Sequence, residues 1–217
     1  MKTLFAWDFH GVLEKDNELA VKEICDTLLR KKSINKEITL EKVRELYGLR
    51  WYDYFTFLFP QASHKELMET VGEAIAMSGH LTKNFLKAND YAEDVLQKIK
   101  NQGHWNIVVS NSCQVRIMDF VSWVKLDHLV SEVIGIDKHQ NDSSFDLVKE
   151  KAKVVKDQAE KLGAQKIVMV GDREEDILAG LAVGAVTYLY KGLLSRHSGE
   201  TKARHIVTDL REVLKEL

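Results

Sequence analysis

The sequence predicts an α/β protein in which a doubly wound parallel sheet is interrupted by an all-helical insertion. Short, continuously apolar runs alternate with amphipathic helical patterns along most of the chain, which is the order expected of strands joined by helices. One stretch, 17–85, breaks this alternation because it holds helical patterns and no convincing strand. Strands separated by helices are joined by right-handed crossovers, and these produce a parallel sheet with helices on both faces.

Four apolar runs account for the predicted sheet. Each is too short and too continuously apolar for a surface element, as expected of a strand that is buried on both faces. The runs are LFAWDF at 4–9, WNIVVS at 105–110, KIVMVGD at 166–172 and AVTYLY at 185–190. Helical patterns between the strands stop at glycines, as YAEDVLQKIKNQG does at Gly103 and KVVKDQAEKLG does at Gly163. We therefore expect a Rossmann-like core.

The insertion is predicted to be a separate helical cap. Three helical patterns fill it, at 18–31, 39–48 and 63–77. The last of them begins with Ser63 and Glu66, which have the spacing of a capping box. The predicted domains are a Rossmann-like core, 1–16 and 86–217, and a cap, 17–85.

Composition narrows the classes of partner. The chain has 217 residues, 45% of them hydrophobic, and a formal net charge of -2 without a basic patch, which gives no basis for binding nucleic acid or an anionic membrane. Cys25 and Cys113 lie far apart in no metal-binding spacing, as expected in a reducing compartment. The N-terminal apolar run is too short for a signal peptide, and no window is long enough to span a membrane. We expect a cytoplasmic monomer or homodimer.

Three predicted strands end on polar side chains. Asp8 follows the first strand, Ser110 and Asn111 end the second, and Asp172 ends the third. Taken singly, each has an ordinary explanation as a turn or helix-cap residue. Three such endings at the carboxyl edge of a parallel sheet, where ligands bind, favour a site. Asp176 lies four residues after Asp172, so both carboxylates could face one hard cation.

These residues resemble the motifs of the haloacid dehalogenase-like hydrolases. DFHGVL at 8–13 resembles the first motif of that family, VVSNS at 108–112 the second and VGDREED at 170–176 the fourth, in the family's order. The resemblance covers the whole chain and puts the insertion in the place of the family's helical cap. It implies that Asp8 is the nucleophile, which attacks phosphorus to give an aspartyl-phosphate.

The resemblance also implies a metal site. Mg²⁺ would be held by Asp8, by the backbone carbonyl of His10 and by Asp172, with Asp176 nearby as a ligand or as a support for one. Phosphoryl transfer spreads negative charge over the non-bridging oxygens, so the site also needs fixed donors. Ser110 and the backbone N–H groups that begin the next helix would supply them.

A lysine is expected to complete the site, and the sequence leaves two candidates. The stretch LVKEKAKVVKDQAEKLG at 147–163 offers several lysines, most of which belong to a solvated helix face. Lys151 has the spacing that we prefer for the family's motif lysine. Lys149 has the alternative spacing, and we expect it otherwise to contact substrate, together with Asn111.

His10 departs from the family's pattern. Phosphatases of the family carry an aspartate at this position, which protonates the leaving oxygen and then activates water. Histidine can serve as a general acid or base, so a Mg²⁺-dependent phosphatase of a small phosphorylated metabolite is the favoured function. Two alternatives stay open. The chain could be a non-catalytic module that binds phosphate or a partner, in which the replacement of the usual aspartate by His10 has abolished catalysis. It could also be a haloacid dehalogenase, which needs no metal.

Substrate selectivity is expected in the cap. ELYGLRWYDYF at 45–55 resembles the specificity loop of β-phosphoglucomutase-like members, with Gly48 at the bend and Arg50 directed at the site. Arg50 could bind a second anionic group of the substrate. Alternatively, WYDYFTFLF at 51–59 forms cap core or a dimer face.

Overall fold

The computed structural model describes residues 1–47, 49–137, 146–192 and 199–217. The chain forms two compact units. The core unit consists of Met1–Lys15 and Ala88–Leu217, and the cap unit is Asp16–Lys87, against the predicted 17–85. None of the helices in the described ranges is both long and apolar enough to cross a membrane.

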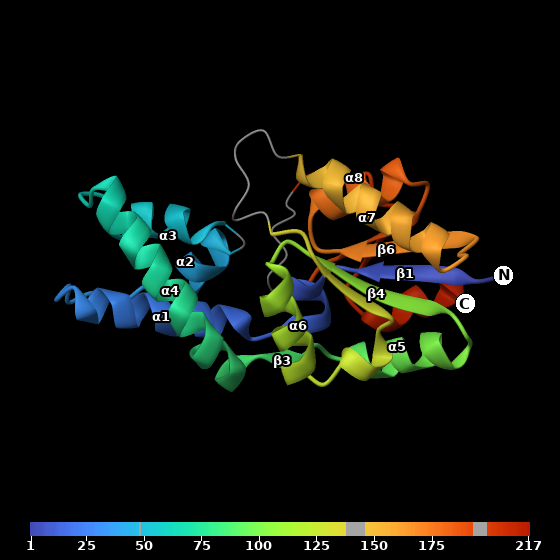
Figure 1. The fold of residues 1–217 in the computed structure, drawn as a ribbon, viewed down its shortest axis with the longest axis horizontal. Helices are drawn as coiled ribbons and strands as arrows, with labels where there is room; N and C mark the ends of the chain where they lie inside the picture. Colours follow the sequence, from blue (N-terminus) through green and yellow to red (C-terminus); the bar gives the residue numbers. More distant parts are fainter. Residues whose placement is uncertain (48, 138–145, 193–198) are drawn as a thin grey trace. The chain divides into compact units, whose positions relative to one another are not determined.

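A six-stranded sheet forms the centre of the core unit (Figure 1). All neighbouring strands are parallel, and their order is β5-β4-β1-β6-β7-β8. The strands are β1 (Thr3–Trp7), β4 (Trp105–Ser110), β5 (Glu132–Gly135), β6 (Lys166–Gly171), β7 (Val186–Tyr190) and β8 (His205–Val207). The predicted parallel α/β fold is therefore confirmed, and the four predicted strands are β1, β4, β6 and β7.

The two edge strands escaped prediction for a physical reason. β5 has four residues and β8 has three, so neither is long enough to show a continuous apolar run. Each pairs with a neighbour along one side only, and β8 leaves Ile206 exposed. Edge strands of this kind carry little hydrophobic signal because they are not buried on both faces.

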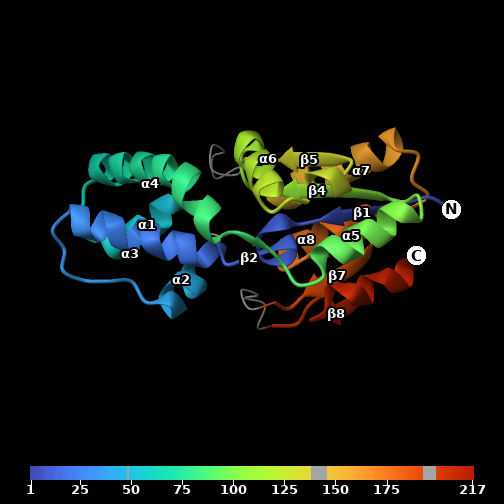
Figure 2. The same cartoon turned by 90° about the horizontal axis from the view of Figure 1, so that it is seen from below.

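Helices cover both faces of the sheet, which is the doubly wound arrangement (Figures 1 and 2). α7 (Leu147–Lys161) and α8 (Glu174–Ala182) lie on one face, and α5 (Ala92–Asn101) and α6 (Gln114–Trp123) lie on the other. Every side chain of β1 is buried, since the strand is central and covered twice. Short 3₁₀ helices at Asp127–Leu129 and Leu210–Glu216 complete the unit.

The cap unit is helical, as predicted. Its helices are α1 (Asn17–Lys31), α2 (Leu40–Leu46), α3 (Trp51–Leu58) and α4 (His64–Phe85). The capping box forms at the start of α4, where the Glu66 N–H donates to Ser63 Oγ and the Ser63 N–H donates to Glu66 Oε2. In α3, the ring of Trp51 stacks on buried Phe55. Two short strands, β2 (Glu14–Lys15) and β3 (Lys87–Ala88), form a separate two-stranded sheet.

Candidate active site

Asp8 lies directly beyond the end of β1, between the neighbouring strands. Its backbone N–H donates to the Val170 carbonyl oxygen at 2.8 Å, which extends the pairing of β1 with β6 by one residue. The chain then turns sharply through Phe9–Leu13. Gly11 makes this possible with a φ of 78°, a left-handed conformation that glycine adopts without strain. The turn leaves the Asp8 carboxylate buried at the carboxyl edge of the sheet.

Asp172 and Asp176 come from the next strand and the helix that follows it. Asp172 succeeds β6, and Asp176 lies in the first turn of α8. A Cβ at Gly171 would stand 2.2 Å from the Cβ of Asp176, so a residue without a side chain is needed for Asp176 to pack here. The carboxylates of Asp8, Asp172 and Asp176 are all buried, and each offers an oxygen within 4.8 Å of the others. We call these three residues the carboxylate cluster.

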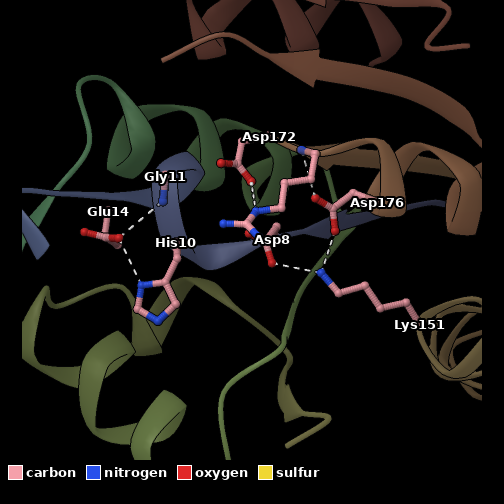
Figure 3. Close-up of polar contacts among 8 residues, drawn as sticks. Asp8, His10, Gly11, Glu14, Lys151, Asp172 and Asp176 are labelled. Atoms are coloured by element: carbon pink, nitrogen blue, oxygen red, sulfur yellow. Dashed lines mark hydrogen bonds and ion pairs between the residues drawn. The ribbon is translucent and has the colours of Figure 1, made fainter. Parts of the chain in front are cut away.

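Lys151 on α7 joins two members of the carboxylate cluster (Figure 3). Its ammonium donates to Oδ1 of Asp8 at 3.0 Å and to Oδ1 of Asp176, and its side chain is 1% exposed. Burial acts to lower the pKa of this ammonium, but the carboxylates of Asp176 and Asp8 outweigh it and raise the pKa above its ordinary value. Burial raises the pKa of Asp176 to about 6, although Lys151 opposes the shift.

Asp172 is the member of the carboxylate cluster that Lys151 does not bind. Within the described ranges its Oδ1 has no hydrogen-bond partner, and the Nε of Arg173 lies 3.8 Å away. Burial and the neighbouring charge of Asp8 raise the pKa of Asp172 well above its ordinary value. A cluster of buried carboxylates with an unsatisfied oxygen suits a hard divalent cation, which prefers oxygen ligands. The residues therefore fit Mg²⁺.

Ser110 and Asn111 lie at the end of β4, next to β1. Ser110 is buried, and its Oγ accepts a hydrogen bond from the Ser112 N–H at 3.3 Å. The side-chain Oδ1 of Asn111 is buried without a hydrogen-bond partner in the part of the chain that the structure describes. Since buried polar atoms are normally satisfied, this oxygen is a candidate contact for a ligand.

Two predicted substrate contacts each form an ion pair with an aspartate three residues away in the sequence. Lys149 has a side chain that is 82% exposed and pairs with Asp146 at 3.2 Å, so the structure does not bring it to the carboxylate cluster. Arg50 precedes α3 in the cap unit, where it pairs with Asp53 at 3.2 Å. Its expected role toward substrate stays a prediction. Gly48 lies outside the described residues.

His10 is turned away from Asp8 (Figure 3). Its Nδ1 lies 3.0 Å from Oε1 of Glu14, and its Nε2 lies 3.1 Å from Oγ of Ser112. From the sequence we expect His10 to act as a general acid or base, and neither of these two partners is predicted. The spacing of four residues between His10 and Glu14 was an available signal, as was the position of Arg173 directly after Asp172.

Comparisons with known proteins agree on one fold. Residues 5–189 match the family model described as haloacid dehalogenase-like hydrolase. No protein with a curated description matches the chain. A proposed phosphatase from Clostridium difficile has a similar structure, with a TM-score of 0.81 and 16% identity over 100% of this chain and 98% of that one.

Two further solved structures are similar along nearly their whole length. A predicted phosphoglycolate phosphatase from Haemophilus somnus has a TM-score of 0.80 and 18% identity, over 99% of this chain and 97% of that one. A haloacid dehalogenase superfamily hydrolase of subfamily IA from Geobacter sulfurreducens has a TM-score of 0.76 and 18% identity, over 100% and 96%. At such identities the likeness shows a common fold.

Proposed function

The chain belongs to the haloacid dehalogenase-like hydrolase family, and we propose that it is a Mg²⁺-dependent phosphatase of a small phosphorylated metabolite. The observation that carries this proposal is the buried contact of Lys151 with Asp8 and Asp176 inside the carboxylate cluster. It supplies a nucleophilic carboxylate, a fixed cation and a set of oxygen ligands for a metal. Two of the similar structures bear phosphatase names, which supports the same reading.

In the first step of the proposed reaction, a carboxylate oxygen of Asp8 attacks phosphorus. The bond to the leaving oxygen breaks, and Asp8 carries the phosphoryl group as an aspartyl-phosphate. Lys151 orients the Asp8 carboxylate by its hydrogen bond to Oδ1 and offsets charge that develops on the phosphoryl oxygens. Ser110 and the backbone N–H groups that begin α6 would bind those oxygens.

In the second step, water attacks the phosphorus of the aspartyl-phosphate, the bond from phosphorus to the Asp8 oxygen breaks, and inorganic phosphate leaves as the Asp8 carboxylate is restored. The proton that the water gives up balances the proton that the leaving oxygen takes up in the first step. The carboxylate cluster, with the backbone carbonyl of His10, would hold Mg²⁺ throughout. When bound, the cation offsets the negative charge of the phosphoryl group. Asn111, through its unsatisfied Oδ1, and Arg50, from the cap unit, remain proposed substrate contacts.

The experiment that tests this proposal is detection of the phosphoenzyme. The protein is incubated with a panel of phosphorylated sugars, nucleotides and small acids, with and without Mg²⁺, and is then quenched in acid. We expect an acid-stable, base-labile phosphoryl label that Asp8→Asn removes and that Asp157→Asn, a change to an exposed carboxylate on α7, retains. A label that survives Asp8→Asn would refute the mechanism.

One observation favours a second candidate, a non-catalytic binding module. The His10 side chain is held by Glu14 and Ser112 rather than directed at Asp8. Measurable Mg²⁺ binding without any phosphoenzyme, across the whole panel, would support this candidate. Hydrolysis of haloacids in the absence of metal would instead support a dehalogenase, in which Asp8 is the nucleophile and Asp172 and Asp176 have no metal to bind.

A further inference from the structure

Arg173 brings a second cation to the carboxylate cluster. It follows Asp172 directly and is the residue that precedes α8. Its backbone N–H donates to Oδ2 of Asp176 at 3.3 Å, and its Nε lies 3.8 Å from Oδ1 of Asp172. Both the backbone and the side chain of Arg173 therefore lie against members of the carboxylate cluster.

The start of α8 holds Arg173 in this position. Its backbone is extended, with a φ of -131° and a ψ of 157°. Its carbonyl oxygen accepts the N–H groups of Asp176 at 3.1 Å and of Ile177 at 3.3 Å. The Arg173 side chain is 22% exposed, whereas that of Asp172 is 2% exposed. Part of the Arg173 side chain therefore meets solvent while its Nε lies beside a buried carboxylate.

The carboxylate cluster keeps the guanidinium of Arg173 charged. Burial acts to lower the pKa of Arg173, but the carboxylates of Asp172, Asp8 and Asp176 outweigh this effect and raise the pKa above its ordinary value. Glu175 acts in the same direction, but it is exposed, so water screens its charge. Since Arg173 interacts with all three members of the cluster, it also interacts with any ion that the cluster binds.

The charges of these groups decide which ions the site attracts. Metal ligands are deprotonated, so the three carboxylates carry three negative charges when they hold a cation. Lys151 and Arg173 offset two of these charges, and Mg²⁺ then gives the site one excess positive charge. With Lys151 alone, the same ion would leave the site neutral. Arg173 thus opposes the binding of Mg²⁺ and favours the binding of an anion beside it.

The shape of a guanidinium suits a phosphoryl group. Two hydrogen bonds of Lys151 go to Asp8 and Asp176, which leaves its ammonium one further N–H. An arginine carries five N–H donors in one plane, and this fork matches two oxygens of a phosphate at once. Arg173 can therefore bind phosphoryl oxygens that Lys151 alone cannot satisfy.

We propose that Arg173 is a substrate-binding residue whose guanidinium binds the phosphoryl group and weakens the binding of Mg²⁺ to the carboxylate cluster. The two effects have opposite signs, because the same positive charge attracts the anion and repels the cation. A residue that only supported the fold of the site would change both affinities in the same direction. The inference rests on the proposed function for the choice of Mg²⁺ and phosphate as ligands, but its test needs no turnover.

The first test measures the affinity for Mg²⁺ by calorimetric titration without substrate. Arg173→Gln removes the positive charge, and we expect it to bind Mg²⁺ about tenfold more tightly than the unmodified protein. Arg173→Lys keeps the charge and should bind Mg²⁺ within about twofold of the unmodified affinity. The control is Arg211→Gln, which removes an exposed arginine that pairs with Asp209 at 2.6 Å and should leave the affinity unchanged.

The second test measures the binding of inorganic phosphate at a Mg²⁺ concentration that saturates each protein. We expect Arg173→Gln to weaken phosphate binding about tenfold or more, as for the loss of hydrogen bonds to a charged group. Arg173→Lys should weaken it less, because the charge is kept and only the planar fork is lost. Arg211→Gln should have no effect.

Tighter binding of Mg²⁺ together with weaker binding of phosphate in Arg173→Gln supports the proposal, and any other pattern overturns it. An Arg173→Lys protein that binds Mg²⁺ as tightly as Arg173→Gln also overturns it. Circular dichroism shows whether each variant is folded. If Arg173→Gln is not, Arg173→Lys decides the matter, since unchanged phosphate binding in that variant overturns the proposal.

These outcomes are separate from those that test the phosphatase function. If the unmodified protein binds Mg²⁺ and phosphate but forms no phosphoenzyme with any member of the panel, the phosphatase function fails, and the titrations still decide the role of Arg173. If the unmodified protein binds no Mg²⁺, both proposals are overturned.

Discussion

Lys151 lies 143 positions from Asp8 in the sequence, and its ammonium stands 3.0 Å from Oδ1 of that carboxylate. Both groups are buried, so water screens their attraction little. The same ammonium also donates to Asp176, which places one positive charge between two members of the carboxylate cluster. Removal of this lysine would leave both carboxylates buried without their cation.

Lys151→Met should therefore abolish phosphatase activity and destabilise the metal-free protein. Breaking a buried ion pair by removing one partner costs about 3 to 5 kcal/mol in free energy of unfolding. The matched control is Lys149→Met, which removes an exposed lysine from the same helix. Urea denaturation and steady-state kinetics of both variants check the prediction. Equal effects of the two changes would contradict the placement of Lys151.

Asp8→Asn should reduce turnover by several orders of magnitude while the fold is kept. The amide is nearly the same size as the carboxylate but is not a nucleophile, and loss of a covalent nucleophile has effects of this scale in other enzymes. Circular dichroism and kcat for the preferred substrate provide the measurement. A variant that keeps the unmodified rate would exclude Asp8 as the attacking group.

Asp172→Ala should raise the Mg²⁺ concentration needed for half-maximal activity sharply. Removing an anionic oxygen ligand leaves the cation with fewer charged contacts. Calorimetric titration of the protein with Mg²⁺, without substrate, should show the same weakening. Asp119→Asn, a change to a surface carboxylate that pairs with Arg116 on α6, serves as the control. Identical Mg²⁺ titrations for Asp172→Ala and this control would remove Asp172 from the site.

The raised pKa of Asp176 predicts a dependence of stability on pH in EDTA. Because burial raises this pKa from 3.8 to about 6, the folded protein binds more protons than the unfolded chain between those values. The contribution of this group to stability therefore falls as pH rises from about 4 to 6. The difference in free energy of unfolding between Asp176→Asn and the unmodified protein should grow over that window. A difference that is constant with pH would contradict the prediction.

His10 should matter most for poor leaving groups. If position 10 takes part in proton transfer, His10→Ala slows hydrolysis of an alkyl phosphate more than that of an activated aryl phosphate, whose leaving oxygen needs no proton. His10→Asp restores the residue that the family usually carries and should raise turnover of the alkyl ester. Rates for both esters with all three proteins check this. Equal slowing of both esters by His10→Ala would deny His10 a selective role.

The periodicity of α7 indicates in part which of the two lysines is buried. Lys151, Val155 and Ala159 recur every four residues, and all three are buried on α7. That periodicity favours Lys151 over Lys149 as the buried lysine. It identifies Lys151 with certainty only when the face of α7 that packs on the sheet is known. Spacing along the chain alone could not supply that face.

The strand ends at Asp8 and Asp172 were predictable because an apolar run that stops at a carboxylate can be recognised in the sequence itself. The contact of His10 with Ser112 was not, since it joins residues 102 positions apart through the pairing of β1 with β4. Glu14 gave no hydrophobic signal, and its buried carboxylate accepts a hydrogen bond from the Gly11 N–H in the turn after β1.

The close approach of Asp176 to Gly171 leaves no room for the carboxyl group to move toward β6. The carboxyl group of Asp176 packs directly against the backbone of β6 at Gly171, with no side chain between them. Asp8 is tied to the same strand by its N–H bond to Val170. The positions of these two carboxylates therefore both depend on β6, a central strand of the sheet.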